Sequence, residues 1–137
     1  MRAWLGRILR RPANLGDTGE RHAADFLSRL GYKIVARQHS SRIGEIDLIA
    51  MDGQTIVFVE VKTRRTLSAG APVEAVTARK QAQLSRAALV YLKRNGLLER
   101  RTRFDVVGVL MPDGQAVPAI THYRDAFTPT GSGQMFA

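Results

Sequence analysis

The alternation of apolar and polar residues along the chain predicts two amphipathic helices. From 17 to 30, apolar side chains recur at the i, i+3, i+4 and i+7 spacing of one helix face, and Gly31 ends the pattern. A second helical pattern follows Thr77, whose hydroxyl is suited to cap a helix, and ends near Asn95, just before Gly96. Each helix therefore has one face that needs a core to pack against.

Short runs rich in β-branched residues predict the strands. They lie at Tyr32–Gln38, Glu45–Met51, Thr55–Lys62 and Phe104–Met111, with a last short run at Ile120–Arg124. Asp52-Gly53, between the second and third runs, is a strong hairpin signal. The order is α-β-β-β-α-β-β, and a strand followed by a helix and another strand is typical of a parallel crossover. We therefore predict an α/β fold with a mixed central sheet flanked by helices.

The predicted hairpin gathers acidic side chains on one face of the sheet. With Asp52-Gly53 as the central turn residues, Asp47 lies opposite Phe58, and Glu45 lies opposite Glu60. Because opposed residues share a face, the end away from the turn carries four charged side chains: Glu45, Asp47, Glu60 and Lys62. The other face is apolar and comprises Ile46, Leu48, Ala50, Val57, Val59 and Val61. A shift of one residue would separate Asp47 from Glu60.

This cluster is suited to a hard divalent cation. Carboxylates this close raise one another's pKa unless a cation neutralises them. The Asp47 and Glu60 backbones are about 7–8 Å apart on the diagonal, and their side chains can close on one Mg²⁺ at ligand distances of ~2.1 Å. Lys62 lies on the same face, within reach of a bound water or phosphate. Glu20 has two compatible readings, a capping-box partner of Asp17 or a fourth acid facing the sheet.

The amino-acid composition excludes several kinds of site and indicates the chemistry of the partner. The chain has 137 residues, 21 Lys+Arg against 12 Asp+Glu, a net charge of +9 and a pI near 11.0. It has no cysteine, which excludes disulfides, a thiol nucleophile, a zinc ribbon and an Fe–S cluster. His22, His39 and His122 are too scattered for a zinc site, and no apolar run approaches the ~20 residues of a membrane span. The positive charge indicates a polyphosphate partner.

The charge is unevenly distributed along the chain. Residues 1–37 carry a net +5 and residues 66–103 a net +6, whereas residues 38–65, which hold the acidic cluster, are neutral. The expected contacts for a phosphate backbone are a stripe on the second helix and two arginines after the hairpin, namely Arg79, Lys80, Arg86, Lys93, Arg64 and Arg65. A basic helix face is also often only a solvated surface.

We expect one folded domain at 16–127, preceded by a basic segment at 1–15 and followed by a flexible tail at 128–137. The basic segment has an apolar face around Trp4 and is interpreted as a frayed terminus. The alternative is a helix that lies on an anionic membrane or on a partner. Because the segment lacks the long apolar core of a signal peptide, we expect a cytoplasmic protein.

Several longer motifs resemble one known family. The chain contains, in order, GDTGERHAADFLSRLGYKIVARQ, RIGEIDLIAMDG, VFVEVKTR, AVTARKQAQL and RFDVVGV. They resemble the YraN family of predicted endonuclease-like proteins, in the PD-(D/E)XK, restriction-endonuclease-like superfamily, which is similar in turn to Holliday-junction resolvases. The resemblance covers about residues 16–127. One position departs from it, because Ile46 stands where nucleases of this fold often have proline before the metal-binding aspartate.

The resemblance implies a restriction-endonuclease-like core of order α-β-β-β-α-β. It also implies a nuclease that depends on Mg²⁺ or Mn²⁺ and hydrolyses phosphodiester bonds of DNA, with branched or repair intermediates as one substrate class. In such a site Asp47 and Glu60 bind the metal, together with the carbonyl of Val61.

The resemblance assigns roles to further residues. Lys62 would orient the attacking water and stabilise the developing charge, and Glu20 would match an acid of the first helix. Lys80 and Gln81 would face the site from the second helix, and Glu45 is a secondary candidate. Two oligomeric states stay open, a monomer and a homodimer like that of the resolvases.

Two other interpretations of the same residues remain open. In one, the chain is a non-catalytic nucleic-acid-binding module that keeps the fold and binds DNA with strong salt dependence and without metal. In the other, Glu60 and Lys62 form only a strand-end ion pair. The intact set of Asp47, Glu60 and Lys62 weighs against the first, since idle buried carboxylates are costly. Asp105 is interpreted as the strand-end partner of an arginine.

Overall fold

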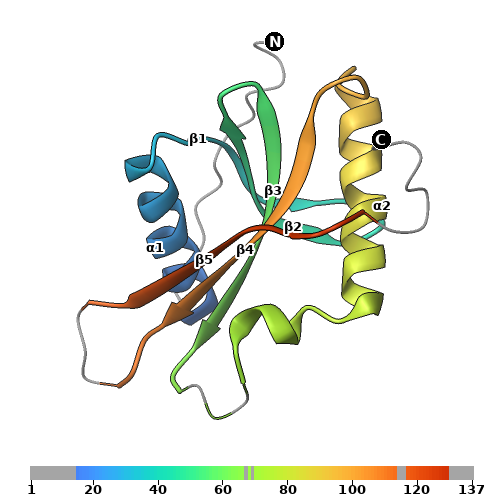
Figure 1. Cartoon of the computed structure of the whole chain (residues 1–137). Coiled ribbons are helices and arrows are strands. Elements are labelled where there is room, and N and C mark those ends of the chain that lie inside the picture. Colours follow the sequence, from blue (N-terminus) through green and yellow to red (C-terminus); the bar gives the residue numbers. More distant parts are fainter. Residues whose placement is uncertain (1–14, 67, 69, 114–116, 130–137) are drawn as a thin grey trace.

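Five strands form a single open sheet with an α-helix on each face (Figure 1). The computed structural model describes residues 15–66, 68, 70–113 and 117–129. In chain order the elements are α1 (Leu15–Arg29), β1 (Lys33–Ser40), β2 (Glu45–Asp52), β3 (Thr55–Arg64), the short 3₁₀ helix η2 (Pro72–Ala75), α2 (Ala78–Arg94), β4 (Thr102–Leu110) and β5 (Ala119–Phe127). The predicted order of α-helices and strands is confirmed.

The strands lie in the sheet in their sequence order, β1-β2-β3-β4-β5. Neighbouring strands are antiparallel except β3 and β4, which are parallel and joined through η2 and α2. This connection is the predicted crossover. At its helix, the hydroxyl of Thr77 accepts a hydrogen bond from the N–H of Lys80 at 3.2 Å, so the predicted cap begins α2. The fold is α/β with a restriction-endonuclease-like core.

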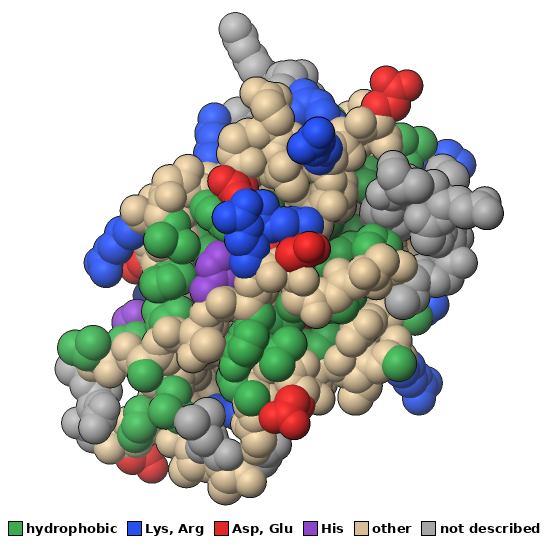
Figure 2. Space-filling view, viewed as in Figure 1, with side chains coloured by type: hydrophobic (Ala, Val, Ile, Leu, Met, Phe, Trp, Pro, Cys, Tyr) green, Lys and Arg blue, Asp and Glu red, His purple; other side chains and the backbone are tan. Residues whose placement is uncertain are grey.

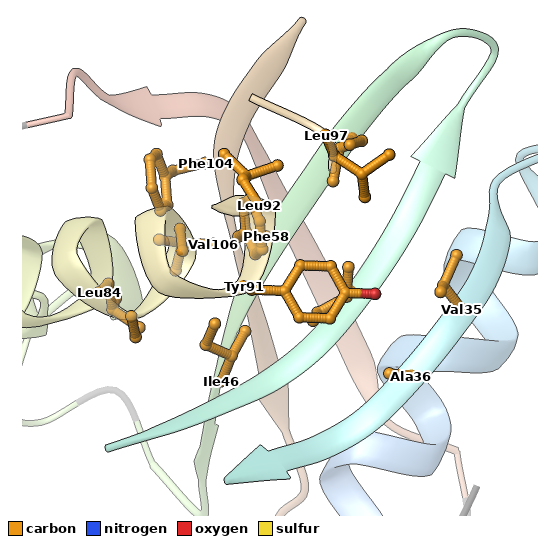
Figure 3. Packing of buried hydrophobic residues seen from close by; sticks show 14 of the residues in the cluster. Val35, Ala36, Ile46, Phe58, Leu84, Tyr91, Leu92, Leu97, Phe104 and Val106 are labelled. Carbon is orange, nitrogen blue, oxygen red and sulfur yellow. The ribbon is translucent and has the colours of Figure 1, made fainter. Parts of the chain in front are cut away.

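Two apolar layers lie on opposite faces of the sheet. The layer under α1 contains Leu27 and Val57. The layer under α2 contains Tyr91 and Phe58, whose rings meet edge to face with centroids 5.9 Å apart (Figure 3). Val57 and Phe58 are neighbours in β3, and both are almost completely buried. Burial of each such side chain contributes about 1.5–3 kcal/mol, so β3 is a firmly held central strand from which site residues project.

The turn between β2 and β3 lies one residue later than predicted. Asp52 pairs with Thr55, so Gly53 and Gln54 are the turn residues, and the φ of +59° at Gly53 suits glycine. Asp52 is held in the strand because its Oδ2 accepts a hydrogen bond from Nη1 of Arg103 at 2.8 Å. That contact joins residues 51 positions apart, which no local turn pattern reveals.

The corrected turn changes which residues face each other across the hairpin. The recorded ladder ends, at the open end, with Leu48 opposite Val59. Continued by one pair, this register sets Asp47 opposite Glu60 and not opposite Phe58, so the predicted pairing is wrong by two residues. A shift of two residues does not by itself move a side chain to the other face, and here it brings the two principal acids closer than the predicted diagonal does.

Strand β2 breaks its regular alternation next to Asp47. Ile46 packs with Ile49 in the layer under α2, whereas Leu48 belongs to the layer under α1. The prediction that Ile46 and Leu48 share one face is therefore wrong. Because the side chains change direction between these two residues, the acids at the start of β2 are not confined to the face that regular alternation assigns them.

The two terminal segments lie almost entirely outside the described residues. The basic segment predicted at 1–15 lies outside the described residues except for its last position, and so does the tail predicted at 128–137 except for its first two. Across the described ranges, no helix has the length and apolar character needed to cross a membrane.

Candidate active site

Three carboxylates from two elements meet where β2 begins. One side-chain oxygen of each of Glu20, Glu45 and Asp47 lies within 4.8 Å of those of the other two. Glu20 comes from α1, so the two acids of β2 reach toward the face that α1 covers. Glu60, in contrast, pairs with a lysine of α2. The side chains of Glu60 and Asp47 also share a hydrogen bond, so the acids meet at the open end of the hairpin, where residues from both faces of the sheet reach them.

Asp47 is fixed to β3 through the backbone. The N–H of Val61 donates a hydrogen bond to Oδ2 of Asp47 at 2.8 Å. Burial and, next, the negative charge of Glu60 raise the pKa of Asp47 to about 8, while the hydrogen bond from Val61 acts in the opposite direction. The two acids named by the motif therefore lie close enough for their negative charges to repel each other. The N–H of Val61 thus contacts the site, and the metal-binding role that the resemblance implies for its carbonyl stays a prediction.

Glu20 reaches the cluster because α1 packs very closely on β3. A Cβ at Gly19 would lie 1.9 Å from Oγ1 of Thr63, so only glycine permits this approach. The neighbouring Glu20 is buried, with 8% of its surface exposed. Burial, the largest cause, raises the pKa of Glu20 to about 7, and the charge of Glu45 adds to the increase.

The predicted capping pair at the start of α1 takes a different role. Asp17 is the third residue of the helix, and its Oδ1 accepts a hydrogen bond from Nε2 of Gln38 at 2.6 Å. The N-cap assignment of Asp17 is therefore wrong. Gln38 is buried, has a φ of +49° and also hydrogen-bonds Glu20, which lowers the pKa of that acid. Of the two readings of Glu20, the geometry matches an acid facing the sheet.

Two lysines converge on Glu60. Oε2 of Glu60 lies 3.3 Å from Nζ of Lys62 and 3.8 Å from Nζ of Lys80. Glu60 is only 5% exposed, whereas the lysine side chains are 29% and 33% exposed. The site therefore combines buried acceptors with cations that open toward solvent. Lys80 lies inside this cluster as well as at the end of the basic stripe.

The donor set fits a divalent cation that prefers oxygen. Oε1 of Glu20 and Oε1 of Glu60 are buried and have no hydrogen-bond partner among the residues described, although such atoms normally have one. The residues able to hold the cation are Glu20, Glu45, Asp47 and Glu60. Carboxylate oxygens are the usual ligands of Mg²⁺ and Mn²⁺. A cation would favour the charged carboxylates and so offset the burial and, next, the mutual repulsion that raise the pKa values of Glu20 and Asp47.

The stripe on α2 lies partly outside this cluster. Arg79 and Arg86 are exposed and, with Lys80 and Gln83, line an open groove of about 350 Å³. Lys93 is exposed in the last turn of the helix, at the end away from Glu60. The groove therefore begins at Lys80, next to the carboxylates, and leads onto the helix surface.

Two of the other candidates, Arg65 and Gln81, are held by contacts outside the carboxylate cluster. Arg64 is half-buried at the end of β3, and Arg65 is exposed and 3.4 Å from the carboxylate of Asp113. Nε2 of Gln81 donates to the carbonyl of Val76 at 3.0 Å. That bond secures the entry to α2, and the structure does not bring the Gln81 amide into the carboxylate cluster by any recorded contact.

Asp105, His39 and His122 have structural partners. Asp105 is completely buried and accepts from Nε of Arg103 at 3.0 Å, as predicted for a strand-end partner of an arginine. Nε2 of His122 lies 2.7 Å from its other oxygen. His39 packs edge to face on Tyr91, and burial lowers its pKa.

Sequence reasoning missed the supports of the site. Gln38 holds the two acids of α1, and Gly19 allows Glu20 to approach β3. Nothing in the local pattern distinguishes Gln38, because its role depends on α1 packing over β1. Gly19, in contrast, is a glycine inside a predicted helix directly before an acid, and this is a usable signal of close packing.

The fold and the site define a class: an α/β protein of restriction-endonuclease-like architecture with buried carboxylates and two lysines at the open end of its central hairpin. The chain belongs to the uncharacterised protein family UPF0102, whose family model matches residues 19–109. This is the YraN family, so the resemblance drawn from the sequence is confirmed.

Relatives of this family match most of the chain. A UPF0102 protein of Trichlorobacter lovleyi is 51% identical over 114 residues, which cover 82% of this chain and 89% of that protein. One from Geobacter sulfurreducens is 50% identical over 115 residues, with 82% and 88% covered. One from Symbiobacterium thermophilum is 55% identical over 102 residues, with 74% and 86% covered. These names state a family and no reaction, so function is inferred from the site.

Proposed function

We propose that this protein is a nuclease that depends on a divalent metal and hydrolyses phosphodiester bonds of DNA. The observation that supports it most is the arrangement of Asp47, Glu60 and Lys62. Asp47 and Glu60 are neighbouring acids from adjacent strands, and the ammonium group of Lys62 lies 3.3 Å from Glu60. Hydrolysis of a phosphodiester needs an oriented water and neutralisation of charge that develops on the phosphate. Neighbouring acids and an adjacent cation meet both needs.

Each residue has a role in this proposal. Asp47 and Glu60 hold Mg²⁺ or Mn²⁺, and Glu20 and Glu45 are ligands on the α1 side. The bound cation supplies Lewis-acid chemistry and lowers the pKa of water. Lys62, which is partly exposed, orients the attacking water and stabilises the charge that builds up on the phosphate.

The groove on α2 gives the substrate a path to the site. Lys80 lies at its inner end beside Glu60, and Arg79 and Arg86 line it further out. Arginine and lysine side chains at such a surface bind phosphates without reading sequence. We therefore propose a nucleic-acid backbone that runs along α2, with the scissile phosphate next to Lys62 and Lys80.

The substrate class is tested by offering linear duplex, flapped and four-way DNA in parallel. Two opposed nicks in a four-way junction need two active sites, and a homodimer would supply them. Size-exclusion chromatography with light scattering, on the free protein and on the junction complex, checks this. Preference for the four-way substrate by a protein that remains monomeric on it would contradict the dimer.

The central experiment measures cleavage with Mg²⁺, with Mn²⁺ and with EDTA. Asp47→Asn and Lys62→Ala are each expected to abolish cleavage, since the first removes a charged ligand and the second removes the cation beside the phosphate. Asp113→Asn is the matched control, because Asp113 is exposed and, within the described part of the chain, its one recorded ion pair is with the exposed Arg65. Cleavage that survives both changes, or that proceeds equally in EDTA, would overturn the proposal.

One observation favours a second function, a nucleic-acid-binding module without catalysis. Lys62 and Lys80 both approach the same oxygen of Glu60, so the charge of that acid is already compensated within the protein. A carboxylate whose charge two lysines already neutralise needs no metal. The second function predicts DNA binding that weakens steeply with salt, is unchanged by EDTA and survives Asp47→Asn, with no cleavage of any of the three substrates.

A further inference from the structure

A second polar pocket lies at the other end of the sheet from the candidate active site. Its volume is about 530 Å³, within the ~300–1,000 Å³ usual for small-ligand sites. It lies where β3 and β4 begin, and Thr55, the first residue of β3, lines it. Glu60 is five residues further along the strand, roughly 17 Å away at the usual rise per residue. The pocket is therefore separate from the carboxylate cluster.

Arginines from three parts of the chain line this pocket. They are Arg100 and Arg101 before β4, Arg103 in β4 and Arg124 in β5. The planar guanidinium fork matches the geometry of a phosphate better than a lysine does. Arg103 is committed to the protein, because it donates to Asp105 at 3.0 Å and to Asp52 at 2.8 Å. Arg103 therefore forms a fixed wall of the pocket, and other arginines of the lining are the ones available to contact a ligand.

Two of the other guanidinium groups can take a ligand. Arg101 is exposed, and no carboxylate of the described ranges lies within 4.0 Å of it. Its backbone is nevertheless fixed, since its carbonyl accepts from the N–H of Ile56 at 2.8 Å. Arg124 is 67% exposed, and its guanidinium lies 3.5 Å from the carboxylate of Asp52. The same carboxylate oxygen already accepts a hydrogen bond from Arg103. Such an exposed pairing is weak, so a phosphate can replace it.

The rest of the lining indicates more than a bare anion. Glu99 and Asp125 also border the pocket and would repel a simple inorganic anion. Asp125 is held with a φ of +53°, and its N–H donates to Asp105 at 2.9 Å, so the strand bulges there. Carboxylates of this kind accept hydrogen bonds from hydroxyl and amino groups. Leu92 and Leu98 add an apolar wall suited to a ring.

We propose that this pocket binds a nucleoside monophosphate unit, either as a free nucleotide or as the phosphorylated end of a nucleic-acid strand. The phosphate contacts Arg101 and Arg124, the sugar or base donates to Glu99 and Asp125, and the ring lies on the leucines. Figure 2 shows the mixture of charges on the face crossed by β5, where Lys and Arg side chains lie beside acidic ones. The proposal is independent of the nuclease function, since it uses none of the same residues.

The test is calorimetric titration of the full chain with adenosine 5′-monophosphate, adenosine and inorganic phosphate. The nucleotide is expected to bind saturably, and each fragment at least about tenfold more weakly, because each uses half of the lining. The double variant R101Q/R124Q is expected to weaken nucleotide binding roughly tenfold or more. R29Q/K33Q is the matched control: it removes two exposed charges near the α1–β1 connection and leaves binding unchanged.

A second arm distinguishes the two sources of the ligand. A short single-stranded oligonucleotide is titrated with and without a 5′-phosphate, and Asp47→Asn is included to show independence from the candidate active site. Tighter binding of the phosphorylated strand than of the free nucleotide, lost in R101Q/R124Q, identifies a strand end; the reverse order identifies a free nucleotide. No saturable binding of either, or equal affinities in R101Q/R124Q and R29Q/K33Q, overturns the proposal.

Discussion

The backbone N–H of Val61 donates to the carboxylate of Asp47 at 2.8 Å, one step beyond the last recorded pair of the β2–β3 ladder. The bond joins the two strands where their regular pairing stops. It also fixes one oxygen of Asp47, whose carboxylate belongs to the cluster of acids. The carboxyl group is held in place whether it is charged or neutral, and this property gives the first prediction.

The stability of the metal-free protein is expected to fall as the pH rises. The pKa of Asp47 is raised from 3.8 to about 8 and that of Glu20 from 4.5 to about 7. Between these limits the folded state binds more protons than the unfolded state, so the free energy of unfolding decreases from about pH 4 to pH 8. Mg²⁺ is expected to restore stability most at the upper end. Thermal unfolding in EDTA and in Mg²⁺, measured across this range, checks both slopes.

The variant Asp47→Asn separates this effect from general acid behaviour. An amide oxygen can still accept from Val61, but it carries no charge, so the variant is expected to be at least ~1 kcal/mol more stable than the wild type at pH 8 in EDTA. It should also lose most of the stabilisation by Mg²⁺. A variant that is less stable than wild type at pH 8 without metal would contradict the assigned origin of the pKa shift.

The sequence predicted correctly those features that depend on residues close together in the chain. The cap at Thr77 is predictable because it depends on a local contact, a hydrogen bond to Lys80 three residues further along the chain. The crossover and the two apolar layers follow from period and order alone. These features depend on neighbours in the chain, and the sequence pattern records such neighbours directly.

The errors concern contacts between distant segments. The turn lies one residue later than predicted because Asp52 binds Arg103. Asp17 does not cap α1, because its side chain binds Gln38. Ile46 changed layers where β2 stops pairing regularly with β3. The chemical types at the site were thus predictable from motif residues, but their mutual geometry required the packing of α1 and β4 against the hairpin.

Gly19→Ala tests how closely α1 must approach β3. The added Cβ would lie 1.9 Å from Oγ1 of Thr63, so the helix must move or the strand must give way. We expect a loss of roughly 1–3 kcal/mol in the free energy of unfolding, as for overpacked cores, and a further loss of metal binding because Glu20 moves with the helix. Urea denaturation and Mn²⁺ titration measure the two effects.

The double variant G19A/T63A provides the control, because it removes the oxygen and methyl group that the new Cβ meets. It is expected to recover part of both losses. Failure of Thr63→Ala to relieve either defect would show that Gly19 is needed for a reason other than this contact.

Lys80 is expected to contribute less to cleavage than Lys62. Lys62 lies closer to Oε2 of Glu60, at 3.3 Å against 3.8 Å, and it is the lysine of the motif. We therefore expect Lys80→Ala to reduce single-turnover cleavage about tenfold and to lower the salt dependence of DNA binding by about one phosphate contact. Lys62→Ala should reduce cleavage by roughly 10²-fold or more with little change in binding.

Lys33→Ala is the matched control, since Lys33 is exposed at the start of β1, away from the cluster. A cleavage defect in Lys80→Ala as large as that in Lys62→Ala would assign the water-orienting role to Lys80, and the proposed division of labour between the two lysines would then be wrong.

Asp105 is the residue whose loss should destabilise the fold most. It is completely buried and accepts from Nε of Arg103 at 3.0 Å and from the N–H of Asp125 at 2.9 Å. Asp105→Ala removes a main partner of Arg103, whose side chain is only 11% exposed, so we expect a loss of about 3–5 kcal/mol. Asp113→Ala, at a side chain that is 85% exposed, should change stability by no more than about 0.5 kcal/mol. Chemical denaturation measures both, and the variant R103M/D105A, which removes both charges, should recover part of the loss. If Asp105→Ala costs no more than Asp113→Ala, the buried arginine is solvated in another way and the network does not hold β4 to β5.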